Sequence, residues 1–376
     1  MAAGDMYDPE WQEYKDPVSG ARVRRLTDYM GHSNHLYFTS SGRWDDGRRL
    51  VFMSDRENRT NWFSVDLEGG GVVQLTDLES GPPGLNSSLN PARDELYFWC
   101  NRQLMALDLA GRDLRLLYEP PEGFRTGNVS CVADGASLVT VLIEDLSDRL
   151  RLDLGHGYVG FEEHFRADPL CRILRVCTET GDPQLVREEE CWIGHVNASP
   201  ARADLLTFCH EGPWNLVDNR IWGMDIASGE VWRIRPRQCD ESVGHEYWLA
   251  DGETVGYHGR HPGGPNLFGH IGADGSERME TTTHAETGHM HSRDGDLVVG
   301  DGGSELRLWR RSGDGYEGPR VLCEHRCSKH MQRLHVHPRF SPNGRQVLFT
   351  SDRSGYGNLY LADIPDFEDL PPLDRQ

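Results

Sequence analysis

The segment SPNGRQVLFTSD at residues 341–352 has the pattern that decides the fold, a Pro-Asp-Gly type of turn followed by a short apolar strand. Strands bounded by Gly, Asp and Asn are typical of antiparallel hairpins. Six further copies of the pattern are WDDGRRLVFMSD (44–55), NPARDELYFWC (90–100), VADGASLVTVLI (132–143), SPARADLLTFC (199–209), LADGETVGYHG (249–259) and SRDGDLVVGDG (292–302). The chain therefore repeats one hairpin seven times.

The spacing of the copies indicates the architecture. The turn markers are Asp46, Ala92, Asp134, Ala201, Asp251, Asp294 and Asn343, which are separated by 46, 42, 67, 50, 43 and 49 residues. A period of roughly 40–50 residues with four short strands per unit is the signature of propeller blades. We therefore predict an all-β, seven-bladed β-propeller that forms a single domain over residues 1–376. Closure removes exposed sheet edges, so we expect the N-terminal segment 21–28 to complete the last blade.

Two segments depart from the repeat. The 67-residue step predicts an insertion in blade three, within residues 144–163. The tail from Pro365 is acidic and rich in proline, which predicts a solvated chain end.

Bulk properties narrow the classes of partner. The net charge of −21 repels nucleic acid and anionic membranes, and it requires any site for an anionic sugar to supply its own positive charge. No stretch approaches the roughly 18 consecutive apolar residues of a membrane span. The start of the chain lacks the basic and apolar regions of a signal peptide, and the nine cysteines lack disulfide-like spacing. These features predict a cytoplasmic protein with reduced thiols, and they leave its oligomeric state open.

Histidines recur at one phase of the repeat. The first strand of a propeller blade lines the central channel, so residues about six positions before each marker are expected at equivalent depth. These residues are Ser40, Asn86, Asn128, His195, His245, His289 (five before its marker) and His337. Four successive blades thus carry a histidine, and His335 faces the same side as His337. Each histidine alone could be a structural, hydrogen-bonded residue. Together they predict a site for manganese, iron, nickel or zinc.

Several motifs around these histidines resemble the oligogalacturonate lyases, over nearly the whole chain. The matching segments are EWQEYKDPVSGARVRRLTD (10–28), FCHEGPW (208–214), NRIW (219–222), VGHEYW (243–248), LVVGDG (297–302) and the Gln-x-x-His-x-His pattern at 332–337. The resemblance implies a seven-bladed propeller, in agreement with the repeats counted independently. It also implies a divalent metal, with manganese as the first expectation.

The resemblance implies roles for individual residues. The metal ligands would be Gln332, His335, His337 and His289, with His291 as a rival to His289. His245 of the Gly-His-Glu motif would abstract a proton, and Arg220 would bind the substrate and assist catalysis. Further candidates for substrate contact are His210, His195 and Tyr356, while His32 and His35 stay ambiguous.

The implied reaction is β-elimination of short uronic-acid oligosaccharides, with oligogalacturonides as the first expectation and a 4,5-unsaturated uronate as product. A metal and Arg220 would neutralise the C6 carboxylate, and neutral His245 would accept the C5 proton. Segments 32–44 and 155–165 differ from typical members, which leaves open a lyase for a different uronide. A non-catalytic interaction propeller and a metal-dependent hydrolase are further alternatives, and the hydrolase would be expected to use carboxylate ligands.

Overall fold

The structure is a computed structural model that describes residues 2–81, 85–154, 157–238 and 241–373. Strands dominate it. Its helical segments within these ranges are α1 (Phe161–Arg166) and the 3-10 turns η1 (Arg56–Asn58), η2 (Gln332–Leu334) and η3 (Phe367–Asp369). Among the described residues, none of these helices has the length and apolar character needed to cross a membrane.

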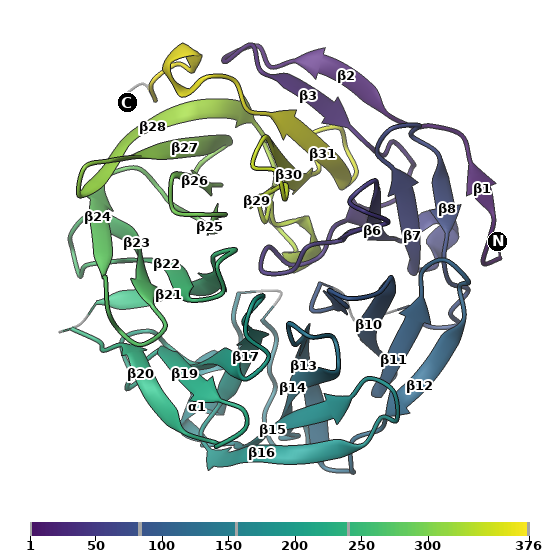
Figure 1. Ribbon diagram of the computed structural model, residues 1–376, viewed down its shortest axis with the longest axis vertical. Helices are drawn as coiled ribbons and strands as arrows, with labels where there is room; N and C mark the ends of the chain where they lie inside the picture. Colours follow the sequence, from purple (N-terminus) through teal and green to yellow (C-terminus); the bar gives the residue numbers. More distant parts are fainter. Residues whose placement is uncertain (1, 82–84, 155–156, 239–240, 374–376) are drawn as a thin grey trace. The chain divides into compact units, whose positions relative to one another are not determined.

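The strands of the described ranges form seven sheets (Figure 1). The first sheet contains β1 (Met6–Tyr7), β8 (Val72–Gln74), β7 (Asn61–Asp66), β6 (Arg49–Ser54), β4 (Ser33–Asn34) and β5 (Arg43–Trp44), and the second contains β9 (Ser88–Leu89), β10 (Glu95–Cys100), β11 (Gln103–Asp108) and β12 (Leu114–Tyr118). The third contains β13 (Phe124–Cys131), β14 (Ser137–Glu144), β15 (Leu170–Cys177) and β16 (Pro183–Glu190), the fourth contains β17 (Ile193–Ala198), β18 (Leu205–His210), β19 (Ile221–Asp225) and β20 (Val231–Arg235), and the fifth contains β21 (Ser242–Trp248), β22 (Thr254–Arg260), β23 (Asn266–Gly272) and β24 (Met279–Thr283). The sixth contains β25 (Met290–Ser292), β26 (Leu297–Gly300), β27 (Glu305–Ser312) and β28 (Gly315–Glu324), and the seventh contains β29 (Arg339–Phe340), β30 (Gln346–Ser351), β31 (Asn358–Asp363), β3 (Arg22–Arg25) and β2 (Gln12–Lys15).

Each of the seven turn markers lies in a different sheet, between strands that pair as a hairpin. Asp46, for example, lies between β5 and β6, and Asn343 lies between β29 and β30. The chain is a seven-bladed β-propeller, and the interpretation of the repeat is confirmed.

The chain divides into two compact units that are not continuous in sequence. Unit 1 comprises Met1–Leu85, Pro265–Gly269 and Met279–Gln376, and unit 2 comprises Asn86–Gly264 and His270–Arg278. Strand β23 begins in unit 1 and ends in unit 2. The expectation that residues 1–376 form one domain stays a prediction.

In unit 1 the N-terminal segment completes the last sheet, as the sequence predicted. β3 pairs antiparallel with β31, with Val23 opposite Ala362, and β2 adds a further strand beyond β3. Figure 1 shows these purple strands beside the yellow β31. Val23, Ala362 and Tyr360 are fully or almost fully buried in one apolar cluster, which fixes the register of the closing strand.

The prediction for the C-terminal tail is wrong for its described part. Phe367 of η3 and Leu370 are buried and belong to the same apolar cluster as β31. Arg320 of β28 donates a 2.6 Å hydrogen bond to the carbonyl oxygen of Leu370. The acidic and proline-rich composition misled the sequence analysis, because two apolar side chains suffice to anchor the tail.

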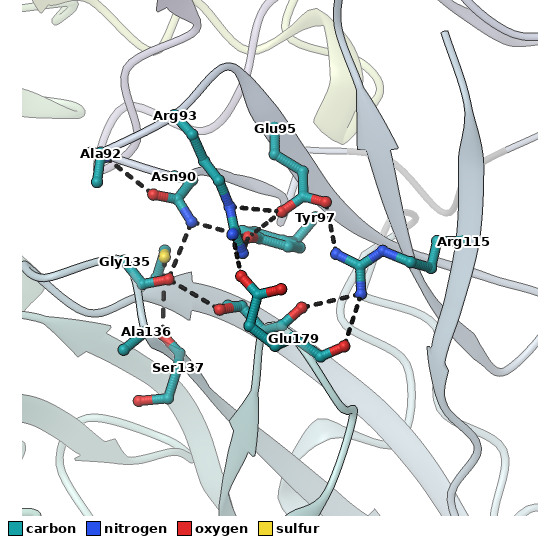
Figure 2. A network of polar contacts seen from close by, with 12 residues as sticks. Asn90, Ala92, Arg93, Glu95, Tyr97, Arg115, Gly135, Ala136, Ser137 and Glu179 are labelled. Atoms are coloured by element: carbon teal, nitrogen blue, oxygen red, sulfur yellow. Dashed lines mark hydrogen bonds and ion pairs between the residues drawn. The ribbon is translucent and has the colours of Figure 1, made fainter. Parts of the chain in front are cut away.

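In unit 2 polar side chains join the turn of one blade to the next blade (Figure 2). Asn90 Nδ2 donates to the hydroxyl oxygen of Tyr97 at 2.8 Å and to the carbonyl oxygen of Gly135 at 3.0 Å. Arg115 contacts Glu95 at 2.6 Å. Gly135 has φ of +72°, which glycine adopts without strain. The turn residues that mark the repeat therefore also connect neighbouring sheets within this unit.

The insertion predicted within residues 144–163 falls in the connection between β14 and β15, at residues 145–169. This connection contains α1, whose His164 ring lies 4.4 Å from the Trp192 ring, centroid to centroid. Residues 155–156 of the segment 155–165 lie outside the described residues.

Candidate active site

Three histidines of unit 1 lie close enough together to share one metal ion. The candidate ligand nitrogens of His289, His335 and His337 all lie within 4.8 Å of one another. His289 directly precedes β25, whereas His335 and His337 lie between η2 and β29. The ring centroids of His289 and His337 are 4.4 Å apart. The fold thus brings together three of the four residues that the resemblance implied as ligands.

A buried carboxylate orients one of these rings. Asp301 Oδ1 accepts a 2.6 Å hydrogen bond from the backbone N–H of His289, and its Oδ2 lies 3.2 Å from His289 Nδ1. A carboxylate that contacts one ring nitrogen in this way is common behind metal-binding histidines. Burial opposes ionisation of Asp301, but the neighbouring His289 holds the pKa of its carboxyl below the usual value. The sequence analysis missed this role, although Asp301 belongs to the LVVGDG motif.

The electrostatics favour neutral imidazoles at this cluster. Burial, followed by the proximity of His289, lowers the pKa of His335 and places the pKa of His337 well below its ordinary value. The neutral ring is the form that binds a metal.

The structure separates His289 from its rival His291. His291 is buried two residues further along, and its Nδ1 accepts a 3.3 Å hydrogen bond from the backbone N–H of Phe340. It is not one of the three clustered histidines. Gln332 begins η2, and its carbonyl oxygen accepts a 3.1 Å hydrogen bond from the His335 N–H. A ligand role for the Gln332 side chain stays a prediction.

Segment 32–44 places aromatic rings against the histidine cluster. The Tyr37 ring lies 4.8 Å from the His337 ring, and the Phe38 ring lies 5.6 Å from the His289 ring, centroid to centroid. His35 lies elsewhere, with Nε2 3.4 Å from the carbonyl oxygen of Val336. The segment that differs from typical family members is therefore in contact with two of the three clustered histidines.

Two other residues of unit 1 that the sequence singled out lie against each other. Tyr356, in the turn between β30 and β31, is 43% exposed. The His32 ring packs edge-on against it at 5.5 Å, and His32 Nδ1 accepts a hydrogen bond from the Gly357 N–H. Tyr356 is accessible to a sugar, whereas the ring of His32 packs against Tyr356 and accepts a backbone hydrogen bond.

In unit 2, His245 lies in a β-bulge. The pairing of β21 with β22 shifts between Gly244 and Tyr247, and His245 has φ of +52° in the left-handed region. Its Nδ1 lies 2.6 Å from Nε2 of His258 on β22, with the two rings stacked at 4.9 Å. The Trp214 ring lies edge-on to His245 at 5.9 Å. Sequence analysis singled out His245 but did not identify His258.

Arg220 is buried, and two carboxylates share its charge. Its Nη1 lies 2.5 Å from Glu211 Oε1, and its Nε lies 3.7 Å from Glu246 Oε2. Burial opposes the charged form, yet the nearby Cys209 and both glutamates raise the pKa of Arg220 well above its ordinary value. Arg220 therefore forms a buried ion pair, and much of its charge is already balanced.

The remaining histidine candidates of unit 2 lie near this group. His195 Nε2 is 4.0 Å from Glu211 Oε2, and burial lowers the pKa of its ring. His210 has carboxylates on both nitrogens, with Nδ1 2.8 Å from Asp218 and Nε2 3.1 Å from Glu189. Burial opposes the charge on His210, but Cys191, Glu189 and Asp218 raise its pKa to about 10. This arrangement of His210 fits a structural role better than substrate contact.

The inserted helix reaches the same segment. A Cβ built at Gly212 would lie 2.4 Å from Phe165 Cδ2, so the helix packs directly on the residue after Glu211. The φ of Gly212, +145°, is also one that side-chain-bearing residues rarely adopt. Phe165 therefore supports the loop that carries Glu211.

Known proteins share both this fold and most of the chain. The family model described as oligogalacturonate lyase matches residues 1–317. An oligogalacturonide lyase of Pectobacterium atrosepticum is 30% identical, with 97% of this chain and 99% of the relative covered. An oligogalacturonate lyase of Dickeya dadantii is 29% identical over the same shares.

Solved structures agree with these relatives. An oligogalacturonate lyase in complex with manganese has a TM-score of 0.89 and 29% identity, covering 97% of this chain and 99% of that chain. An oligogalacturonate lyase from Vibrio parahaemolyticus has a TM-score of 0.88 and 26% identity over the same shares. Similarity over the full length, in sequence and in fold, shows that this chain is a lyase and belongs to the oligogalacturonate lyase family.

Proposed function

We propose that the protein cleaves short oligogalacturonides by metal-dependent β-elimination, giving a 4,5-unsaturated uronate at the new end. Membership of the family supports the substrate class, since the relatives are named for oligogalacturonides or oligogalacturonate. The observation that carries metal dependence is the cluster of three histidine nitrogens within 4.8 Å. Because the chain is a lyase, a non-catalytic interaction propeller is no longer an alternative.

His289, His335 and His337 would hold a divalent metal, with Gln332 as a fourth ligand. Three imidazoles, one of them backed by Asp301, suit manganese, iron, nickel or zinc. Manganese is preferred because the similar solved lyase was obtained in complex with it. When bound, the metal supplies Lewis-acid neutralisation of the C6 carboxylate, which acidifies the C5–H bond. The cluster consists of three imidazoles, as opposed to the carboxylate ligands expected of the hydrolase alternative.

We assign proton abstraction to His245. Its neutral imidazole would take the C5 proton while the C5–H electrons form the C4–C5 double bond and O4 leaves with the electrons of the C4–O4 bond. The proton that O4 requires would come from the same imidazole or from water. Arg220 would interact with a uronate carboxylate, although Glu211 and Glu246 already share its charge.

The uronide itself is set by residues around these groups. Tyr37 and Phe38 of segment 32–44 touch the clustered histidines, and Tyr356 is exposed to solvent. Specificity for a different uronide stays the alternative, because two segments that differ from typical members support the proposed site residues. We place the reaction in the cytoplasm, since all eight described cysteines are free thiols, as expected in a reducing compartment.

A panel of uronate oligomers tests the substrate class. The protein is incubated with manganese and each oligomer, and the ultraviolet absorbance of the conjugated double bond is followed. We expect the fastest rise with short oligogalacturonides. A rise only with another uronide would support the alternative, and no rise with any uronide, at full metal occupancy, would refute the elimination.

Two substitutions test the roles of His245 and Arg220. His245→Ala should keep the metal and still bind oligogalacturonide, while single-turnover rates fall by about 10²–10⁴-fold, the usual contribution of a general base. Arg220→Ala should weaken substrate binding as well as turnover. Metal content and single-turnover rates are measured for both. A metal-free His245→Ala protein would make His245 a ligand, and a metal-replete, fully active one would exclude it as the base.

A further inference from the structure

A second histidine is hydrogen-bonded to the proposed base. His258 faces His245 across the bulge of β21 and β22, with 2.6 Å between His258 Nε2 and His245 Nδ1. The two rings are stacked, with 22° between their planes. His258 is only 7% exposed, which leaves little of its surface for contact with a substrate. We therefore expect His258 to act through its contact with His245.

The bond between the rings decides which nitrogen of His245 can act as a base. A neutral imidazole carries one proton, on either Nδ1 or Nε2. If His245 Nδ1 donates to His258 Nε2, the proton of neutral His245 is on Nδ1 and Nε2 carries the basic lone pair. If His258 Nε2 donates instead, the proton of neutral His245 must be on Nε2, and that nitrogen cannot accept another. Only the first arrangement gives His245 a basic nitrogen outside the pair.

Packing holds the two rings in this relation. The Trp214 ring lies edge-on to both, at 5.9 Å from His245 and 6.4 Å from His258. Trp214 also packs closely on the strand, because a Cβ at Gly244 would lie 2.8 Å from its Cζ2. The left-handed φ of His245 fixes the backbone from which its ring projects. A ring constrained in this way can be set in one tautomer by a single partner.

We propose that His258 is a positioning residue for His245: its Nε2 accepts the Nδ1 proton of His245 and so keeps His245 Nε2 unprotonated and available to the substrate. The inference rests on the function proposed for His245. When the C5 proton moves to His245 Nε2, the C5–H electrons form the C4–C5 double bond and the C4–O4 bond breaks. The Nδ1 proton stays in the bond to His258. Return of the Nε2 proton to O4 or to solvent restores the neutral pair.

Two substitutions of similar size separate positioning from packing. In His258→Gln the amide oxygen can still accept the Nδ1 proton, whereas in His258→Met the sulfur accepts only weakly. We expect His258→Gln to keep kcat within about tenfold of the unchanged protein and His258→Met to lose on the order of 10²-fold, both with nearly unchanged KM. Metal content and melting temperature are measured on each protein, so that a folding defect is recognised. Equal kcat in the two variants, whether high or low, would overturn the proposal.

The tautomer can be read without substrate. Imidazole ¹⁵N–¹H correlation spectra of the full-length protein, assigned with His245→Ala, should show His245 protonated on Nδ1 in the unchanged protein and in His258→Gln. In His258→Met the Nε2-protonated form should appear. An Nε2-protonated His245 in the unchanged protein would overturn the inference even if His258→Met could not be folded. Full turnover by His245→Ala would instead refute the proposed function, and the spectra would still report on the pair.

Discussion

At the scale of single residues, the electrostatic environment of the clustered histidines in unit 1 differs from that of Arg220 in unit 2. In unit 1, burial lowers the pKa values of His335 and His337, which favours the neutral ring that binds a metal. In unit 2 the guanidinium of Arg220 lies near two carboxylates, those of Glu211 and Glu246. In the reaction that we propose, most of the positive charge that a uronate needs would therefore come from the metal, in a protein whose net charge is −21.

His335→Ala should lose metal and activity together. Removing one of three clustered imidazoles should weaken metal affinity by more than the roughly 10–100-fold that loss of an orienting partner costs. Metal content after dialysis and the rate of double-bond formation measure both effects. His330→Ala is the matched control, because the His330 side chain belongs to the same segment and is 61% exposed. A His335→Ala protein with full metal content would remove His335 from the ligand set.

His210 should stabilise the fold in a pH-dependent way. Its pKa is raised to about 10, above the ordinary value near 6.5, so the folded state binds a proton that the unfolded state releases. The contribution is complete below about pH 6.5 and should decline as the pH rises toward 10. We expect the stability difference between the unchanged protein and His210→Gln, from urea unfolding, to shrink across this range. A difference that is constant from pH 6 to pH 10 would contradict the ion-paired state of His210.

At the scale of elements, the N-terminus is held by more than strand pairing. Arg56, fully buried in η1, donates hydrogen bonds to both carboxylate oxygens of Glu10, at 2.7 and 3.1 Å. The Arg56 guanidinium also lies over the Tyr7, Tyr29 and Phe63 rings, at 4.8–5.1 Å. Glu10 precedes β2, so this contact ties the start of the closing strands to the first sheet of unit 1.

Glu10→Gln should destabilise the protein by about 3 kcal/mol, because it leaves a buried guanidinium without its counter-charge. The exposed pair between Arg22 and Asp363 provides the control, since the Arg22 side chain is 54% exposed. Arg22→Gln should change the free energy of unfolding by no more than about 1 kcal/mol. Urea unfolding of both variants compares them. Equal, small effects would mean that the bidentate contact does not hold the N-terminus.

At the scale of the whole molecule, the seven repeats follow one another along the sequence, whereas each compact unit is made of separate sequence segments. Unit 2 is inserted between the two main parts of unit 1, and β23 has residues in both. Neither unit can be cut from the chain without breaking that strand. This continuity supports the proposal that residues 1–376 form one folding domain.

Calorimetry tests that proposal. We expect a single endotherm for thermal unfolding, with agreement between the calorimetric and van 't Hoff enthalpies. Addition of manganese should shift the whole transition upward, because a ligand that binds only the folded state stabilises it. Two endotherms, with only one of them moved by manganese, would show that the units unfold separately.

The fold can be predicted from the amino-acid sequence, because each hairpin is a local structure whose turn residues and apolar strands recur at a regular step. The seven turn markers, the closing strand at 21–28 and the blade-three insertion could all be located in this way. The candidate metal histidines were also visible, since a fixed phase of the repeat brings distant residues to equivalent places.

The partners of each side chain, in contrast, follow from the tertiary structure. Choosing His289 over His291 depends on which ring faces the other histidines, and a difference of two residues on a short strand does not reveal this. His245 and Glu246 lie at a bulge of β21 that no local pattern predicts, so neither the contact of Glu246 with Arg220 nor that of His245 with His258 could be predicted from the sequence. The physical reason is that contacts between strands set the hydrogen bonds, the burial and the charge balance of a side chain. The sequence repeat gives only the order of residues within each strand.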